Sequence, residues 1–385
     1  ETIDEILSVI RDAKRPIIIG GHGIWWSKTE QDLKLAGEQL NIPIFNIPYH
    51  QKLLNADCKA YMGLADIHQY APAKFALSNS DCIIMVGCRL DNQMNFGNPP
   101  LIPAGATLIC INGSNEEIDF NRSADYLLLS DPGAFLNELI KQNIYSSRNM
   151  ELDWLERNIE QRQLWVQRMV ADLEETTSGE DWSGGQIHPL KLSLEVQKAM
   201  KDGDWLIFDG GNTHFWSEIA YNILSSKGLR LGGILHPGSY SLLGVGVSFA
   251  ISAKNLNRKK NVILISGDGA FLSGGLSIEV AFQENLPIVV VIDNNGGLDC
   301  ISQQQERLFA TGTHFATDFR EIPFHDLFNG LGGYGELVTN LKEIGPAVKR
   351  AIASGIPACI NIKAKGVISP IVAATSDKRD KASIE

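Results

Sequence analysis

The segment Gly267–Asn295 reads GDGAFLSGGLSIEVAFQENLPIVVVIDNN, and it decides the fold of the second half of this 385-residue chain. It follows a short, apolar, β-branched run at 262–266, and its GDG start supplies residues that can take the tight conformations of a strand-to-helix turn. A helix-like stretch at 276–283 then leads into a second apolar run at 288–292. The pattern predicts a strand, a crossover helix and a parallel strand, which is the βαβ unit of an α/β fold.

Polar residues follow both predicted strands at the point where each strand ends. Asp268 comes after the first strand and Asn295 after the second. Because a βαβ unit brings these two loops to the same sheet edge, where ligands bind, we expect the two side chains to lie close together. A carboxylate, an amide oxygen and a loop carbonyl suit Mg²⁺, which accompanies substrate phosphates. The alternative is an ordinary crossover with turn residues at its ends. A lone GDG would favour that alternative, but the spaced Asn-Asn pair favours the metal site.

Two upstream segments agree with a phosphate site. Residues 209–213 read DGGNT and follow a predicted strand at 205–208, so their amides and side chains could donate to phosphate. The alternative for DGGNT is a helix entry with Asn212 or Thr213 as the N-cap. Residues 238–246 read GSYSLLGVG and lead into a predicted apolar helix, although a glycine-rich helix start needs no ligand to explain it.

Together these segments resemble the thiamine diphosphate signature, GDG followed by a fixed interval and NN. The resemblance implies that Asp268, Asn295 and the backbone carbonyl of Gly297 hold Mg²⁺, which bridges the two phosphates of the cofactor. It also implies that residues 269–271 wrap the diphosphate and that Leu243 props the two cofactor rings into a bent shape. The complete set of expected cofactor contacts is Asn212, Thr213, Ser241, Leu243, Gly267, Asp268, Gly269, Ala270, Phe271, Asn295, Gly297 and Leu298.

Composition is consistent with an enzyme subunit of this kind and excludes several other classes. The chain is 44% hydrophobic, which suffices for two domains with cores of their own. With 45 acidic against 34 basic residues its net charge is −11, so no basic face for nucleic acid is expected. No apolar run approaches the roughly 18 residues that span a bilayer. The six cysteines form no CxxC pair and predict buried thiols in a reducing compartment, so we expect a cytoplasmic protein.

The first part of the chain predicts a separate α/β domain. It opens with an amphipathic helix and continues with alternating strands and helices. The first strand, 16–19, ends in a GGHG turn at 20–23, a partial glycine motif that gives only weak support for a nucleotide site, and we expect His22 to be structural. The further strands are expected at 43–45, 82–86, 108–111 and 126–129.

The whole chain is therefore expected to be an α/β protein with two doubly wound parallel-sheet domains. A central Rossmann-like domain at 1–145 is followed by a helical linker at 146–187, a thiamine diphosphate-binding domain at 188–366 and a C-terminal tail at 367–385. The linker holds a charged helix at 150–173 and then a Gly- and Ser-containing break. In the tail, Lys378, Arg379 and Lys381 could meet coenzyme A phosphates, although a solvated end is the simpler explanation.

The resemblance extends over nearly the whole chain, to the middle and C-terminal domains of the acetolactate synthase, oxalyl-CoA decarboxylase and 2-hydroxyacyl-CoA lyase superfamily. Relatives begin with a further pyrimidine-binding domain, whose glutamate drives formation of the reactive carbanion. Nothing in this sequence matches that domain, so the catalytic glutamate cannot be assigned. We expect either a partial polypeptide or one half of a split enzyme that works with a pyrimidine-domain polypeptide, as a homodimer or homotetramer.

Three details of the sequence are similar to the lyases and decarboxylases that act on coenzyme A esters. Asn212-Thr213 resembles their GANT loop, where acetolactate synthases carry Gln-His, and the stretches 89–100 and 275–287 run parallel to the same group. Leu298-Asp299 departs from the group, replacing a hydrophobic-Tyr pair, and the 111–114 segment replaces an acidic strand end. The resemblance thus implies a Mg²⁺- and thiamine diphosphate-dependent lyase that cleaves a 2-hydroxyacyl-CoA to an aldehyde or ketone and formyl-CoA, or catalyses the reverse reaction.

Two alternatives stay open. The first is acetolactate synthase-like carboligation or decarboxylation of 2-oxoacids, with a structural flavin that would colour the protein yellow. The second is a non-catalytic subunit that retains the cofactor fold. Intact Asp268 and Asn295 count against the second alternative, because a dead site has no physical need for either residue.

Overall fold

The computed structural model describes residues 3–47, 54–55, 57–141, 150–176, 186–309 and 312–374. The chain forms two compact units, Glu1–Asp172 and Leu173–Glu385. The division falls within the stretch 146–187 that the sequence set apart as a linker. The helix break was expected from Glu174, but the helix continues to Thr176, and the rest of the expected break lies outside the described residues. The three tail residues that could meet coenzyme A phosphates also lie outside the described residues.

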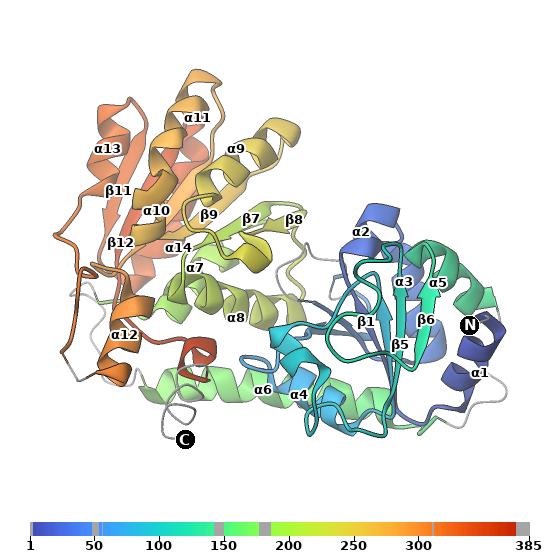
Figure 1. Cartoon of the computed structure of the whole chain (residues 1–385). Coiled ribbons are helices and arrows are strands. Elements are labelled where there is room, and N and C mark those ends of the chain that lie inside the picture. The colour runs from blue at the N-terminus through green and yellow to red at the C-terminus, as the bar shows by residue number, and fades with distance from the viewer. Residues whose placement is uncertain are drawn as a thin grey trace. The chain divides into compact units, whose positions relative to one another are not determined.

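The first unit is built on a six-stranded sheet (Figure 1) with every neighbouring pair parallel. The strand order is β3-β2-β1-β4-β5-β6, the order of a doubly wound Rossmann-like domain. Its strands are β1 (Pro16–Gly20), β2 (Ile44–Asn46), β3 (Tyr61–Leu64), β4 (Cys82–Val86), β5 (Thr107–Asn112) and β6 (Tyr126–Leu129). Its helices are α1 (Ile3–Asp12), α2 (His22–Ser27), α3 (Glu30–Leu40), α4 (Ala71–Asn79), α5 (Pro132–Lys141) and the short η1 (Asn92–Gly97).

The GGHG turn after β1 is explained by packing. A Cβ on Gly21 would lie 2.3 Å from Cys88 Cβ, and one on Gly23 would lie 2.7 Å from Gly87 Cα. Glycine is therefore required where the β1–α2 turn passes directly against the chain that leaves β4. Since close backbone contact accounts for these glycines, the turn adds no support for a nucleotide site.

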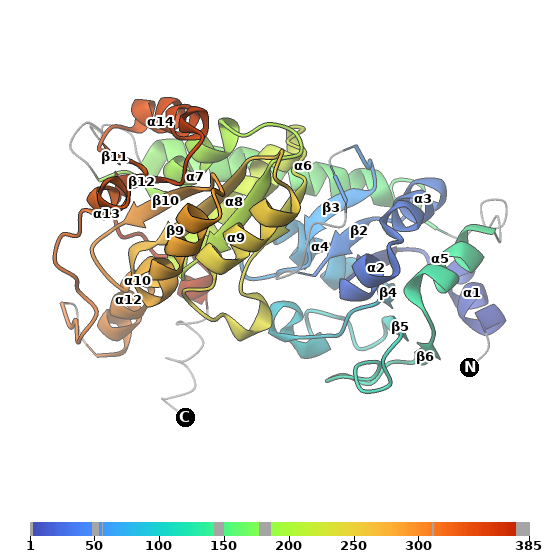
Figure 2. The ribbon, with the colours of Figure 1, turned by 90° about the horizontal axis from the view of Figure 1, so that it is seen from above.

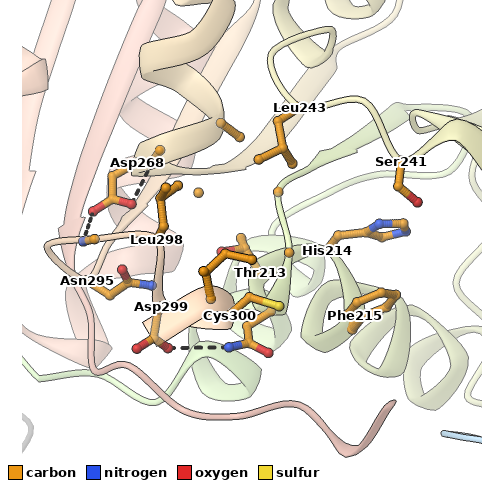
Figure 3. A pocket seen from close by; sticks show the side chains of 18 of the residues that line it. Thr213, His214, Phe215, Ser241, Leu243, Asp268, Asn295, Leu298, Asp299 and Cys300 are labelled. Carbon is orange, nitrogen blue, oxygen red and sulfur yellow. Dashed lines mark hydrogen bonds between the residues drawn. The ribbon is translucent and has the colours of Figure 1, made fainter. Parts of the chain in front are cut away.

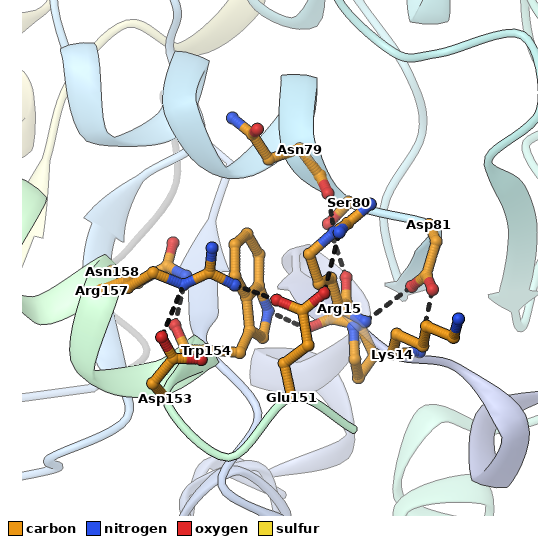
Figure 4. A network of polar contacts seen from close by, with 11 residues as sticks. Lys14, Arg15, Asn79, Ser80, Asp81, Glu151, Asp153, Trp154, Arg157 and Asn158 are labelled. Carbon is orange, nitrogen blue, oxygen red and sulfur yellow. Dashed lines mark hydrogen bonds and ion pairs between the residues drawn. The ribbon is translucent and has the colours of Figure 1, made fainter. Parts of the chain in front are cut away.

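The long helix α6 (Trp154–Thr176) begins by packing against the first unit (Figure 4). Trp154 is fully buried, its indole Nε1 donates to the Pro16 carbonyl at 2.9 Å, and its ring stacks on Phe75. Glu151 forms ion pairs with both Arg15 and Arg157. These contacts fix the start of α6 to the start of β1.

The second unit holds another fully parallel six-stranded sheet, in the order β11-β12-β10-β9-β7-β8. Its strands are β7 (Trp205–Asp209), β8 (Gly233–Leu235), β9 (Val262–Gly267), β10 (Val289–Asn294), β11 (Tyr334–Val338) and β12 (Ala358–Lys363). The helices are α7 (Pro189–Lys198), α8 (Asn212–Ser226), η4 (Gly238–Tyr240), α9 (Gly246–Leu256), α10 (Asp268–Gly274), η5 (Gly275–Ile278), α11 (Glu279–Gln283), α12 (Asp299–Leu308), α13 (Phe324–Gly330) and α14 (Leu341–Ser354).

Successive side chains of the central strands point to opposite faces of this sheet, and they form two hydrophobic cores, one on each face. In β9, Ile263 and Ile265 join a core that contains residues of α7 and α14, whereas Val262 and Leu264 join a core that contains residues of α9, α10 and α13. Strand β10 alternates in the same way. Figure 2 shows α14 on one side of this sheet and α9 on the other. Because side chains on both faces are buried, these strands read as continuous apolar runs, as parallel strands do.

The predicted α/β class with two doubly wound parallel sheets is thus confirmed. The predicted helix at 276–283 was wrong in detail, because the chain turns helical directly at Asp268 and breaks at the Gly274-Gly275 pair into α10, η5 and α11. Four further strands, β3, β8, β11 and β12, were not predicted from the sequence. Among the described residues, no helix is both long and apolar enough to cross a membrane.

Candidate functional site

A cavity of about 290 Å³ opens where β7, β9 and β10 end, at the carboxyl edge of the second sheet (Figure 3). This is the edge at which open α/β sheets bind ligands. Eleven of the twelve cofactor contacts expected from the sequence line it, and all come from one unit. The lining residues are Gly210, Gly211, Asn212, Thr213, His214, Phe215, Pro237, Gly238, Ser241, Leu243, Gly267, Asp268, Gly269, Ala270, Asn295, Gly297, Leu298, Asp299, Cys300 and Ile301.

Asp268 and the loop after β10 are joined directly. The Asp268 carboxylate is buried at the start of α10, where Oδ1 accepts from the Gly269 amide at 2.7 Å. Its Oδ2 accepts from the amides of Gly296 at 2.8 Å and Gly297 at 3.1 Å. Burial raises the pKa of Asp268 to about 6, and these amides partly oppose that rise. Asp268 and Asn295, which were predicted to lie at neighbouring strand ends, therefore line the same cavity.

The cavity is acidic. Its lining, among the residues that the structure describes, contains Asp268 and Asp299 but no lysine or arginine. His214 does not add positive charge near neutral pH, because burial lowers its pKa to about 4. Directly behind the lining, Asp293 is 1% exposed. An anionic ligand in this cavity would face uncompensated carboxylates, so it needs a cation to accompany it.

The oxygen atoms present fit a divalent cation. Asn295 Oδ1 is buried with no hydrogen-bond donor among the described residues, which leaves it available to a metal. An ionised carboxylate has about four acceptor positions, and the three amide bonds of Asp268 leave one open. Within the described ranges, no three His, Cys, Asp or Glu side chains gather as a metal site, so a cation here would depend on one acid plus neutral oxygens. That donor set suits Mg²⁺, which keeps waters and phosphate oxygens as its remaining ligands.

Asn212 and Thr213 lie in the cavity wall, but their side chains are already engaged within the protein. Asn212 Nδ2 donates to Gln303 and Asp299, and Thr213 Oγ1 donates to Asp293 Oδ2 at 2.8 Å. The interpretation of either residue as an N-cap was wrong, since α8 begins at Asn212 and its N-cap is Gly211, without a side-chain bond. The groups of this turn that remain for a phosphate are the backbone amides of the first turn of α8.

Apolar residues form much of the remaining wall, and Phe271 is not among them. Figure 3 shows Leu243 and Leu298 beside the cavity, together with Phe215. Phe271 is buried in the core, edge-on to Phe324 at a ring-centroid distance of 5.5 Å. Of this residue, only the backbone is available for the role the resemblance implies.

Two lining residues, His214 and Phe215, were not predicted from the sequence, and both directly follow the DGGNT motif. Cys300 and Ile301, which follow Leu298-Asp299 in the first turn of α12, also line the cavity. Cys300 is half-buried, whereas the other five free cysteines are buried. The only available signal for His214 and Phe215 was their position within one helical turn after DGGNT.

Family models and known proteins match the chain along most of its length. The model "Thiamine pyrophosphate enzyme, central domain" matches residues 3–139, and "Thiamine pyrophosphate enzyme, C-terminal TPP binding domain" matches residues 209–362. The large subunit of acetolactate synthase from Mycobacterium tuberculosis is 26% identical over 94% of this chain and 61% of its own length. The 2-hydroxyacyl-CoA lyase of Arabidopsis thaliana is 24% identical over 98% of this chain and 63% of its own length.

Further matches agree on the family and on the fold. Oxalyl-CoA decarboxylase of Escherichia coli K12 is 27% identical over 94% of this chain and 61% of its own length. A thiamine diphosphate-dependent 4-hydroxybenzoylformate decarboxylase from Rhodococcus jostii RHA1 superposes with a TM-score of 0.73 at 20% identity, over 95% of this chain and 64% of that one. The chain thus spans about three fifths of the length of these relatives. It belongs to the thiamine pyrophosphate enzymes and carries their central domain and their C-terminal cofactor-binding domain.

Proposed function

We propose that this chain binds thiamine diphosphate through Mg²⁺. We propose further that it is the cofactor-binding part of a carbon–carbon lyase, most like the 2-hydroxyacyl-CoA lyases. The observation that carries the proposal is the contact of Asp268 with the loop after Asn295, in an acidic cavity whose described lining holds no lysine or arginine. A doubly charged diphosphate is stable there only with a metal ion, and the protein offers oxygens for one. Asp268, Asn295 and the Gly297 carbonyl would hold the cation.

Different parts of the cavity wall would then contact different parts of the cofactor. The first-turn amides of α8 point toward the carboxyl edge of the sheet and suit a phosphate oxygen. Leu243 and Leu298 offer apolar surface to the cofactor rings, and neutral His214 adds no charge. When bound, thiamine diphosphate supplies a nucleophilic carbon and stores the electrons of the broken bond, while the protein orients it.

The lyase assignment is supported by the residues of this chain rather than by overall similarity. Identities to synthases, lyases and decarboxylases are alike, at 26%, 24% and 27%. Asn212-Thr213 and the stretches 89–100 and 275–287 favour the group acting on coenzyme A esters. The second candidate is 2-oxoacid carboligation, which the similarity to acetolactate synthases favours.

The proposal includes a partner, a pyrimidine-domain polypeptide that supplies the activating glutamate, and assembly as a dimer or tetramer. The test mixes this chain with such a polypeptide, thiamine diphosphate and Mg²⁺. We expect formyl-CoA release from a 2-hydroxyacyl-CoA and no consumption of pyruvate. Turnover of pyruvate without formyl-CoA release would replace the lyase with the synthase assignment. Absorbance near the flavin bands in the purified protein would point the same way.

A further inference from the structure

Asn212 was expected to contact the cofactor, yet its side chain is fully used inside the protein. Its amide Nδ2 donates to Gln303 Oε1 at 3.0 Å and to Asp299 Oδ2 at 3.4 Å, and its Oδ1 accepts from the Ser369 amide at 2.9 Å. A primary amide has two N–H donors, so neither remains for a phosphate. With 5% exposure, Asn212 lies at the junction of three segments that are far apart in sequence.

One of these segments is the C-terminal strap, residues 366–374. Ser369 is fully buried, and the Val367 carbonyl accepts from Trp216 Nε1 at 3.0 Å. A Cβ on Gly366 would lie 2.4 Å from Asp299 Oδ1, so the strap passes in direct contact with that carboxylate. The strap is thus fastened to α8 at two residues, Asn212 and Trp216.

The second segment is the first turn of α12, which forms part of the cavity wall. Asp299 Oδ2 accepts from Asn212 Nδ2, a bond drawn in Figure 3. The same oxygen also accepts from Gln303 Nε2 at 2.9 Å. This turn directly follows Gly297 and Leu298, two expected cofactor contacts. Holding the turn in place therefore holds the loop that precedes it.

We infer that Asn212 is a positioning residue, which fastens the C-terminal strap and the first turn of α12 to the cavity wall, rather than a ligand of the cofactor. Its influence on a bound cofactor passes through Asp299 and the 297–298 loop. The effect of Asn212 on cofactor binding rests on the proposed function. The hydrogen bonds by which Asn212 holds the strap and the α12 turn do not depend on it.

Cys300 provides a built-in reporter of this fastening. It neighbours Asp299 in the wall and is the one half-buried cysteine, since the other five are buried. The rate at which a thiol reagent modifies native Cys300, located by peptide mass spectrometry, measures how often the α12 turn opens. This readout needs neither cofactor nor turnover.

The experiment compares wild type with Asn212→Ala and Gln303→Ala, with Asn340→Ala as the matched control. Asn340 caps α14 through the Lys342 amide and does not line the cavity. We expect Asn212→Ala to raise the Cys300 labelling rate by about tenfold or more, because it removes three hydrogen bonds that each change an equilibrium roughly 2- to 10-fold. Gln303→Ala should raise it severalfold, and Asn340→Ala should match wild type.

Thiamine diphosphate affinity then separates positioning from direct binding. Gln303 does not line the cavity, so only a positioning role predicts that Gln303→Ala weakens cofactor binding in parallel with its labelling rate. Wild-type labelling in Asn212→Ala, or lost cofactor binding there with Gln303→Ala unaffected, would overturn the inference. If Asn212→Ala does not fold, Gln303→Ala and Trp216→Phe carry the test. Absence of cofactor binding in wild type would defeat the proposed function while leaving the labelling result intact.

Discussion

Replacing Asp293 with asparagine should make the metal-free protein more stable at alkaline pH. Asp293 is 1% exposed, its Oδ2 accepts from Thr213, and its Oδ1 has no donor among the described residues. Burial, together with repulsion from Asp268 and Asp299, raises the pKa of Asp293 to about 7. Asparagine has the same shape and can still accept from Thr213, but it carries no charge.

The size of the effect follows from the pKa of Asp293. A carboxyl group with a folded-state pKa above its unfolded value stabilises the folded state fully below the unfolded pKa, and this contribution is lost as pH rises through the folded pKa. Moving from 3.8 to about 7 corresponds to roughly 4 kcal/mol in total. Of this, roughly 3 kcal/mol is lost between pH 5 and pH 8.5.

Urea unfolding in EDTA across that pH range measures the effect. Asp66 and Asp268 have raised pKa values too, about 7 and about 6, so only the difference between variant and wild type isolates Asp293. We expect the free energy of unfolding of Asp293→Asn to gain up to roughly 3 kcal/mol on wild type from pH 5 to 8.5. The exposed Asp326→Asn should show no such trend. If the difference in the free energy of unfolding between Asp293→Asn and wild type does not change with pH, the raised pKa of Asp293 is refuted.

Three further substitutions test the packing that positions the site. Phe271→Ala should cost about 3–5 kcal/mol in urea unfolding, as a core phenylalanine does, and a cost below about 1 kcal/mol would contradict its core position. Trp154→Phe should lose about 1–3 kcal/mol, because the buried Pro16 carbonyl loses its donor; unchanged stability would contradict that contact. Gly274→Ala would place a Cβ 2.0 Å from the Gly244 carbonyl oxygen, so thermal unfolding should show a loss of at least about 2 kcal/mol, and a wild-type midpoint would contradict the close approach.

The central strands could be predicted because burial on both faces leaves uninterrupted apolar runs, as in β4, β9 and β10. Three of the four missed strands carry weaker signals, whereas the fourth, β12, is buried and central but has its apolar run interrupted by Asn361. Strand β8 has three residues, and β11 is a half-exposed edge strand, so neither presents such a run. Strand β3 is interrupted by Gly63, which has a positive φ of 113°. Short or edge strands depend on tertiary partners that one sequence does not reveal.

The cavity could be located from sequence, but the partners of its side chains could not. Asp268 and Asn295 were placed together by topology alone, because strand ends share an edge. The bonds that occupy Asn212 reach residues 87, 91 and 157 positions away, and local pattern carries no information on them. Phe271 follows the motif directly, yet helical periodicity turns its ring into the core. Asp293 directly follows the apolar run predicted at 288–292, and its proximity to Thr213 emerges only from the fold.

The most direct test of the account is calorimetry of thiamine diphosphate binding with Mg²⁺ or with EDTA. We expect binding only in the presence of the divalent cation. Asp268→Ala and Asn295→Ala should weaken it by at least about 10- to 100-fold, the loss seen even for outer partners of metal ligands. The exposed Asp326→Ala should bind like wild type. Equal affinity of Asp268→Ala and wild type, or full binding in EDTA, would contradict the metal-anchored diphosphate on which the account depends.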